Sequence, residues 1–180
     1  MKRQALTVLG VALAYWALAQ FNAAVLAPIS WARFGQGVDW VYLPSGLRLV
    51  AVLAFGLWGC LGIGLATLLL SISGNPGDPW LVSLGTALIS GFSPWLAYQV
   101  GRWWLQIPQD LNGLTAWQLI QLAALFAITS GSLHQTWYQL TGHTANAITS
   151  AGVMMVGDFL GSLVVLFLLS WGLRSLNRMP

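Results

Sequence analysis

The chain has 180 residues, of which 57% are hydrophobic and only 6% are charged, and its mean hydropathy is +0.74. A water-soluble domain carries about 25% charged residues, so this composition excludes a protein whose whole surface faces water. The net charge of +3 does not indicate a nucleic-acid partner, because the cations stand at the edges of apolar runs, where they orient membrane proteins. We therefore expect a single integral membrane domain over residues 1–180.

The first expected helix covers residues 5–27, between the cations Lys2 and Arg3 and the helix-ending Pro28. A secretory signal peptide also begins with cations, but no small-residue cleavage site followed by a soluble domain is evident, so we predict a retained membrane helix. The link over residues 29–42 holds the mixture of aromatic and charged residues that is typical of a membrane–water interface.

The next apolar run, residues 43–73, is too long for one crossing. Its 31 residues would reach about 46 Å as a single helix, whereas the hydrocarbon core is about 30 Å thick. Gly56, Gly59 and Gly62 each weaken a helix by up to about 1 kcal/mol relative to alanine. We therefore predict a short helical hairpin that breaks between Phe55 and Leu61.

Three further helices are expected over residues 80–102, 114–138 and 147–173, and Pro94 should bend the first of them. Cations near both chain ends, among them Lys2 and Arg174, predict that both termini are cytoplasmic. Two ends on one side require an even number of crossings. The predicted fold is therefore all-α, a polytopic transmembrane helix bundle with six crossings.

Small residues recur at the spacing that lets membrane helices approach closely. Gly56, Cys60 and Gly64 stand at every fourth position, and Gly157 and Gly161 repeat the spacing in the last helix. Packing within one chain explains the pattern most simply, and a dimerisation face is the alternative.

Two ionisable residues, Arg48 and Asp158, lie inside the apolar runs. A charge at the bilayer centre costs about 2.5–3.5 kcal/mol on insertion scales, so such residues usually face the bundle interior and pair. Counting from the outer helix ends places Arg48 about 7 Å deep and Asp158 about 15 Å deep. Two interpretations stay open: an ion pair that fixes helix register, or an outward-facing pocket in which Arg48, Asp158, Ser130, His134 and Gln135 contact a small polar or anionic ligand.

Signals for catalysis or metal binding are weak. His134 and His143 stand nine residues apart, a poor spacing for metal ligands, and Ser45 between Pro44 and Gly46 is typical of a helix start. We therefore expect no catalytic residue, no metal site, no cofactor and no enzyme.

Three sequence pieces resemble the MASE1 family of bacterial membrane sensor domains. Residues 42–46 (Tyr-Leu-Pro-Ser-Gly) are similar to the family's aromatic-x-Pro-x-Gly start, and residues 56–59 with 63–64 resemble its Gly-marked turn between helices. Residues 157–161 (Gly-Asp-Phe-Leu-Gly) resemble its Gly-Asp-x-x-Gly element. The resemblance implies a sensory domain in a bacterial inner membrane. Because the printed chain carries no output domain, it also implies action through a partner protein.

Two other functions remain open. A protein of this size with six helices also resembles the substrate-binding subunit of an energy-coupling vitamin transporter, which docks a partner through small-residue motifs on its first helix. Ala19, Ala23 and Ala27 have that spacing, but the predicted topology places them towards the outer side, which argues against docking at a cytoplasmic partner. The third possibility is a membrane scaffold or assembly subunit that acts only by lateral packing.

Overall fold

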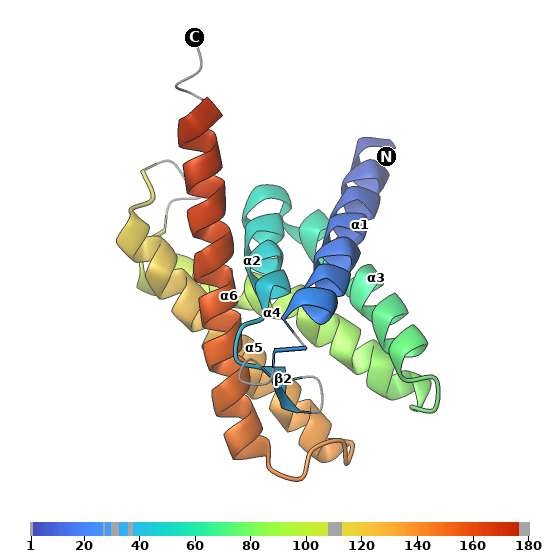
Figure 1. Cartoon of the computed structure of the whole chain (residues 1–180). Helices are drawn as coiled ribbons and strands as arrows, with labels where there is room; N and C mark the ends of the chain where they lie inside the picture. Colours follow the sequence, from blue (N-terminus) through green and yellow to red (C-terminus); the bar gives the residue numbers. More distant parts are fainter. Residues whose placement is uncertain (1, 27, 30–32, 36–37, 108–112, 177–180) are drawn as a thin grey trace.

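The computed structural model describes residues 2–26, 28–29, 33–35, 38–107 and 113–176. Over these residues it is a bundle of six helices with one two-stranded antiparallel ribbon (Figure 1). The helices are α1 (Lys2–Val25), α2 (Leu43–Phe55), α3 (Leu57–Gly74), α4 (Trp80–Trp104), α5 (Ala116–Leu140) and α6 (Ala147–Leu176), and the strands are β1 (Arg33–Gly35) and β2 (Val38–Asp39). The predicted helical bundle is confirmed, whereas the ribbon was not predicted.

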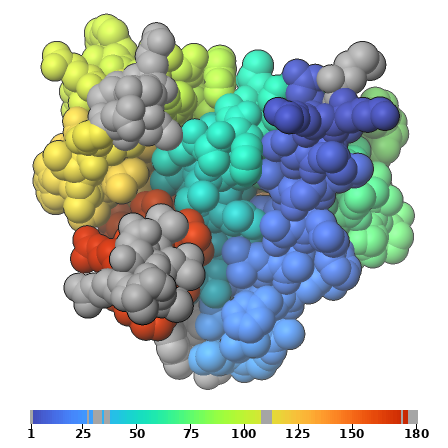
Figure 2. Space-filling model, turned by 90° about the horizontal axis from the view of Figure 1, so that it is seen from above, coloured from blue at the N-terminus to red at the C-terminus, as the bar shows by residue number. Residues whose placement is uncertain are grey.

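The shortest helix, α2, lies at the centre of the bundle. The five long helices pack in the order α1, α3, α4, α5 and α6, and α2 contacts every one of them. Viewed from the end where α1 begins and α6 finishes, the cyan atoms of α2 lie between α1 on one side and α5 and α6 on the other (Figure 2). We call this end the terminal end, and the opposite end, which carries the α3–α4 and α5–α6 links, the link end.

The predicted helical hairpin is confirmed. Helix α2 stops at Phe55, α3 starts at Leu57, and Gly56 between them has φ 55° and ψ −130°. Only glycine adopts this backbone conformation readily. The two helices then pack closely, because a Cβ atom at Gly59 would collide with the carbonyl oxygen of Ala51.

The start of α2 lies deep in the bundle, and our expectation for the preceding link was wrong in its last part. The backbone N–H of Tyr42 donates to the carbonyl oxygen of Gly157 at 3.1 Å. A Cβ atom at Gly157 would collide with the carbonyl of Asp39, and one at Gly161 with that of Tyr42. The glycines of α6 thus admit the backbone of residues 39–42 at the level of Asp158, and the expected depth of about 7 Å for Arg48 is too shallow.

Five helices, α1 and α3–α6, are long and apolar enough to cross a membrane. Helix α2 has 13 residues, about 20 Å of helix, which is less than the hydrocarbon core of about 30 Å. The sixth crossing is therefore not confirmed. Both the start of α1 and the end of α6 nevertheless lie at the terminal end (Figure 1).

The small residues of α3 serve packing within the chain. A Cβ atom at Gly91 of α4 would approach the carbonyl oxygen of Cys60 to 2.6 Å, and one at Gly64 would contact the carbonyl of Ala87 at 3.4 Å. Cys60 itself is buried. The spacing noted in the sequence thus brings α3 and α4 together.

The longest helices carry exposed tryptophans near their ends, as membrane proteins do at the interfaces. Trp103, Trp104, Trp117 and Trp171 are exposed near the terminal end, and Trp80 is exposed at the start of α4. Helix α4 runs without interruption through Pro94. Ala27 and part of the link over residues 29–42 lie outside the described residues.

Candidate functional site

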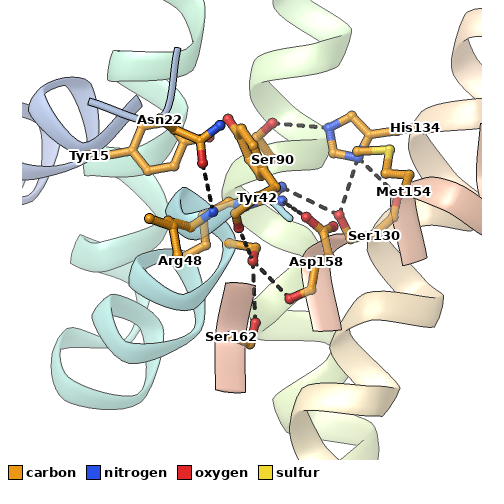
Figure 3. A network of polar contacts seen from close by, with 12 residues as sticks. Tyr15, Asn22, Tyr42, Arg48, Ser90, Ser130, His134, Met154, Asp158 and Ser162 are labelled. Carbon is orange, nitrogen blue, oxygen red and sulfur yellow. Dashed lines mark hydrogen bonds and ion pairs between the residues drawn. The ribbon is translucent and has the colours of Figure 1, made fainter. Parts of the chain in front are cut away.

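The buried ion pair lies at the centre of the bundle (Figure 3). Nη2 of Arg48 lies 2.8 Å from Oδ1 of Asp158, and both side chains are only 1% exposed. Asp158 is about 16 Å from the start of α6 at 1.5 Å per residue, which is close to half the thickness of a hydrocarbon core. Two opposite charges at mid-depth therefore neutralise each other within the protein.

The guanidinium of Arg48 also has aromatic and hydroxyl neighbours. Its Cζ atom lies 5.6 Å from the ring centroid of Tyr42 and 5.2 Å from that of Phe126, distances at which a cation is attracted to the face of a ring. Nη1 donates to the hydroxyl of Ser130 at 3.4 Å. These contacts hold the guanidinium between α5 and α6.

A second part of the polar network extends from Ser130 to α4. Nδ1 of His134 lies 2.9 Å from the carbonyl oxygen of Ser130, and Nε2 lies 3.0 Å from the hydroxyl of Ser90. A carbonyl only accepts, so Nδ1 carries the proton in this contact, and in a neutral ring the hydroxyl of Ser90 donates to Nε2. Side chains from α2, α4, α5 and α6 thus form one network.

The link before α2 is tied to the same network. The hydroxyl of Ser45 lies 2.6 Å from the carbonyl oxygen of Tyr42 and 2.8 Å from that of Asp158, with one proton to donate to either. From α1, the side-chain oxygen of Asn22 accepts from the backbone N–H of Leu43 at 3.0 Å. The hydroxyls of Tyr15 and Tyr42 are 3.1 Å apart.

A cavity of about 320 Å³ adjoins this network on the side of the link end. Its wall is formed by Tyr15, Val38, Asp39, Tyr42, Arg48, Thr67, Leu70, Ser71, Asn75, Thr86, Ser90, His134, Tyr138, Met154 and Asp158. The volume falls at the small end of the range of about 300–1,000 Å³ that is typical of ligand pockets. Polar and aromatic side chains from all six described helices and from the link before α2 therefore converge on one space.

Four buried polar atoms of the lining residues have no hydrogen-bond partner among the described residues. They are Nε of Arg48, Oδ2 of Asp158 and the Oγ1 atoms of Thr67 and Thr86. A buried polar atom without a partner costs about 1–3 kcal/mol, and such atoms in native proteins commonly serve a bound molecule or a water. The cavity wall thus offers both donors and acceptors.

A wider space continues the cavity towards the link end. A second hollow of about 500 Å³ shares Ser71, Asn75, Thr86 and Tyr138 with the first. It extends to Asp78 in the α3–α4 link and to His143 in the α5–α6 link. Nε2 of His143 lies 3.3 Å from Oδ1 of Asp78, so the two links meet at its rim.

The structure places three of the five residues that the sequence suggested as ligand contacts on the cavity wall. Arg48, His134 and Asp158 line the cavity. Ser130 lies behind the wall, where it connects Arg48 to His134. Gln135 is buried but points towards α6, where its Nε2 donates to the sulfur of Met154 at 3.7 Å.

Sequence reasoning missed several residues of the wall. Tyr15 and Thr67 lie in helices that read as uniformly apolar, and each presents one polar atom on an inward face that only the packed bundle identifies. Asp39 was assigned to an interfacial link. The Gly-Asp-x-x-Gly element could have shown that a backbone approaches α6 at this level, but not which backbone.

The described side chains offer no cluster of three histidine, cysteine, aspartate or glutamate residues that could hold a metal ion. Comparisons with protein-family models, with curated proteins and with solved structures gave no significant match.

Proposed function

We propose that this chain is a membrane receptor of the sensory type, which binds a small polar molecule in the central cavity and acts through a partner protein. The observation that carries the proposal is the wall of the cavity of about 320 Å³, where the buried Arg48–Asp158 pair presents polar atoms without protein partners. If the ion pair served only to pack the helices, the fold would be more stable with every donor and acceptor of the pair hydrogen-bonded to another protein group.

The closed floor of the cavity favours a receptor over an open pore. On the terminal side of Arg48, apolar side chains fill the space between the helices. Leu49, Val52, Leu122 and Phe126 are each no more than 1% exposed and belong to two buried apolar clusters. A molecule that enters from the link end therefore reaches a dead end at the ion pair.

The three pieces that resemble the MASE1 family support the sensory class. Residues 42–46 start α2, Gly56 turns α2 into α3, and Gly157 and Gly161 receive the backbone of residues 39–42. All three therefore shape or position α2, the helix that carries Arg48. We infer that the helices of such a domain move relative to α2 when a molecule binds.

We further propose that the protein lies in a bacterial inner membrane with both termini cytoplasmic. Lys2 and Arg174 stand at the terminal end, and cations prefer the cytoplasmic side. The cavity would then open to the outside. A vitamin-type substrate-binding subunit remains the second candidate, because among the described helices α1 packs mainly on α2 and α3 and leaves one side for a transporter partner.

The test is an unbiased search for small molecules that stay bound to the purified chain. Native mass spectrometry is applied to the wild type and to Thr86→Trp, which fills the cavity from its wall. Thr136→Trp, an exposed position on the same bundle, controls for added bulk. We expect an adduct on the wild type and on Thr136→Trp but not on Thr86→Trp. No adduct on the wild type, even after incubation with cell extract, would contradict the proposal.

A further inference from the structure

The ion pair on the cavity wall has consequences for the charge of the molecule that binds there. The positive charge of Arg48 is already compensated by Asp158 at 2.8 Å, and Arg48 is the one cationic side chain among the described lining residues. A second carboxylate, that of Asp39, also lies on the wall. Nothing on the described wall therefore attracts an anion.

An anionic molecule would have to displace Asp158 from Arg48 or add an uncompensated negative charge at mid-depth. Both alternatives are unfavourable, because breaking a buried pair leaves a charge in a medium of low dielectric constant. An uncharged molecule avoids this cost and leaves the pair intact.

The unpartnered atoms specify the hydrogen-bonding groups. Nε of Arg48 donates, Oδ2 of Asp158 accepts, and the hydroxyls of Thr67 and Thr86 do either. A molecule that satisfies them presents an acceptor beside a donor, as the edge of an amide or lactam does. A volume of about 320 Å³ corresponds to roughly ten waters at about 30 Å³ each, so the molecule is small.

We propose that the cavity binds a small uncharged molecule with an amide-type edge, and that it excludes anions. This inference rests on the proposed receptor function and narrows it. The Arg48–Asp158 pair then acts as one neutral recognition unit with a donor and an acceptor, rather than as a cation that captures a carboxylate or a phosphate.

The first experiment uses a metabolite extract that an anion-exchange column divides at neutral pH. After a cation-exchange column has removed cationic compounds, the unretained fraction holds uncharged compounds, and the retained fraction holds anions. We expect only the unretained fraction to raise the Tm of the full chain in detergent, by a few degrees. A response to the retained fraction alone overturns the inference and leaves the receptor function standing. A response to neither overturns the receptor function itself.

A second experiment addresses the wall directly with Thr67→Val. The hydroxyl of Thr67 has no described partner, so its removal should leave the Tm without extract unchanged or slightly higher. The same variant should need about three to ten times more of the unretained fraction for an equal rise in Tm. Thr129→Val, whose hydroxyl donates to the carbonyl of Leu125 away from the wall, should respond as the wild type does. Equal responses of the two variants would overturn the inference.

Discussion

Arg48 is held in its buried position by several neighbours rather than by Asp158 alone. The carboxylate neutralises it at 2.8 Å, the hydroxyl of Ser130 accepts from Nη1, and two aromatic rings lie within 6 Å of its Cζ atom. Charge, hydrogen bonding and ring contacts together replace the water that an arginine loses on burial. The carboxylate has fewer partners, so its dependence on Arg48 is stronger.

Removal of one member of the pair should therefore be far more harmful than removal of both. Asp158→Ala leaves a buried guanidinium without its counter-charge, and we expect the free energy of unfolding in detergent to fall by about 3–5 kcal/mol. Adding Arg48→Leu removes the stranded charge and should restore much of the loss. A double variant as unstable as the sum of the two single variants would contradict direct coupling.

At the residue level the sequence was informative where a rare residue type stood in an apolar run. Arg48, Asp158 and His134 are conspicuous on that ground, and all three line the cavity. Tyr15 and Thr67 are common in membrane helices, so only their inward orientation marks them. Gln135 shares a helix turn with His134, yet a rotation of about 100° per residue directs it to Met154 instead.

At the level of the elements, α6 depends on glycine at the two positions where the link before α2 meets it. A Cβ atom at Gly161 would collide with the carbonyl of Tyr42, which is backbone and has little room to move. The Gly-x-x-x-Gly spacing, usually taken to pack one helix on another, here accepts an extended segment and the first turn of a helix.

Gly161→Ala should therefore lower the free energy of unfolding by at least about 1–3 kcal/mol, the usual cost of overpacking. Gly152→Ala on the same helix is the matched control, since nothing lies within 4 Å of the added methyl group. The control should be neutral or stabilising by up to about 1 kcal/mol, because alanine favours the helix. Thermal unfolding that gave equal stabilities for the two variants would argue against the close approach.

The turn between α2 and α3 depends on glycine for another reason. A Cβ atom at Gly56 would meet nothing within 4 Å, but its φ of 55° with ψ −130° is unfavourable for other residues. Gly56→Ala should cost about 1–3 kcal/mol of backbone strain. Gly10→Ala in α1, which also has open space, should cost nothing, and a Gly56→Ala protein as stable as Gly10→Ala would refute the assigned backbone conformation.

For the whole molecule, hydropathy and glycine placement predicted the helices and the hairpin but not the depth of α2. The sequence predicted a break between Phe55 and Leu61 in the run of 31 residues over 43–73, with both parts crossing the membrane. The structure instead starts α2 level with Gly157, because β2 and residues 40–42 fold inward from the link end. The hydropathy pattern of the sequence indicates which segments are apolar. It does not predict that the link before α2 enters the bundle.

The terminal end and the link end should nevertheless face opposite sides of the membrane, with both chain ends on one side. The 180 residues contain a single cysteine, Cys60, which is 1% exposed and should not react with a membrane-impermeant maleimide. New cysteines then report on position: Gly77→Cys in the α3–α4 link and Gln4→Cys at the start of α1 lie at exposed sites, and Ser175→Cys near the end of α6 lies at a half-buried one. In intact cells we expect labelling of Gly77→Cys alone, because the cations near both ends favour the cytoplasm. Gln4→Cys and Ser175→Cys should react only after the membrane is opened, and labelling of one of these two in intact cells would place the chain ends on opposite sides and refute the even count.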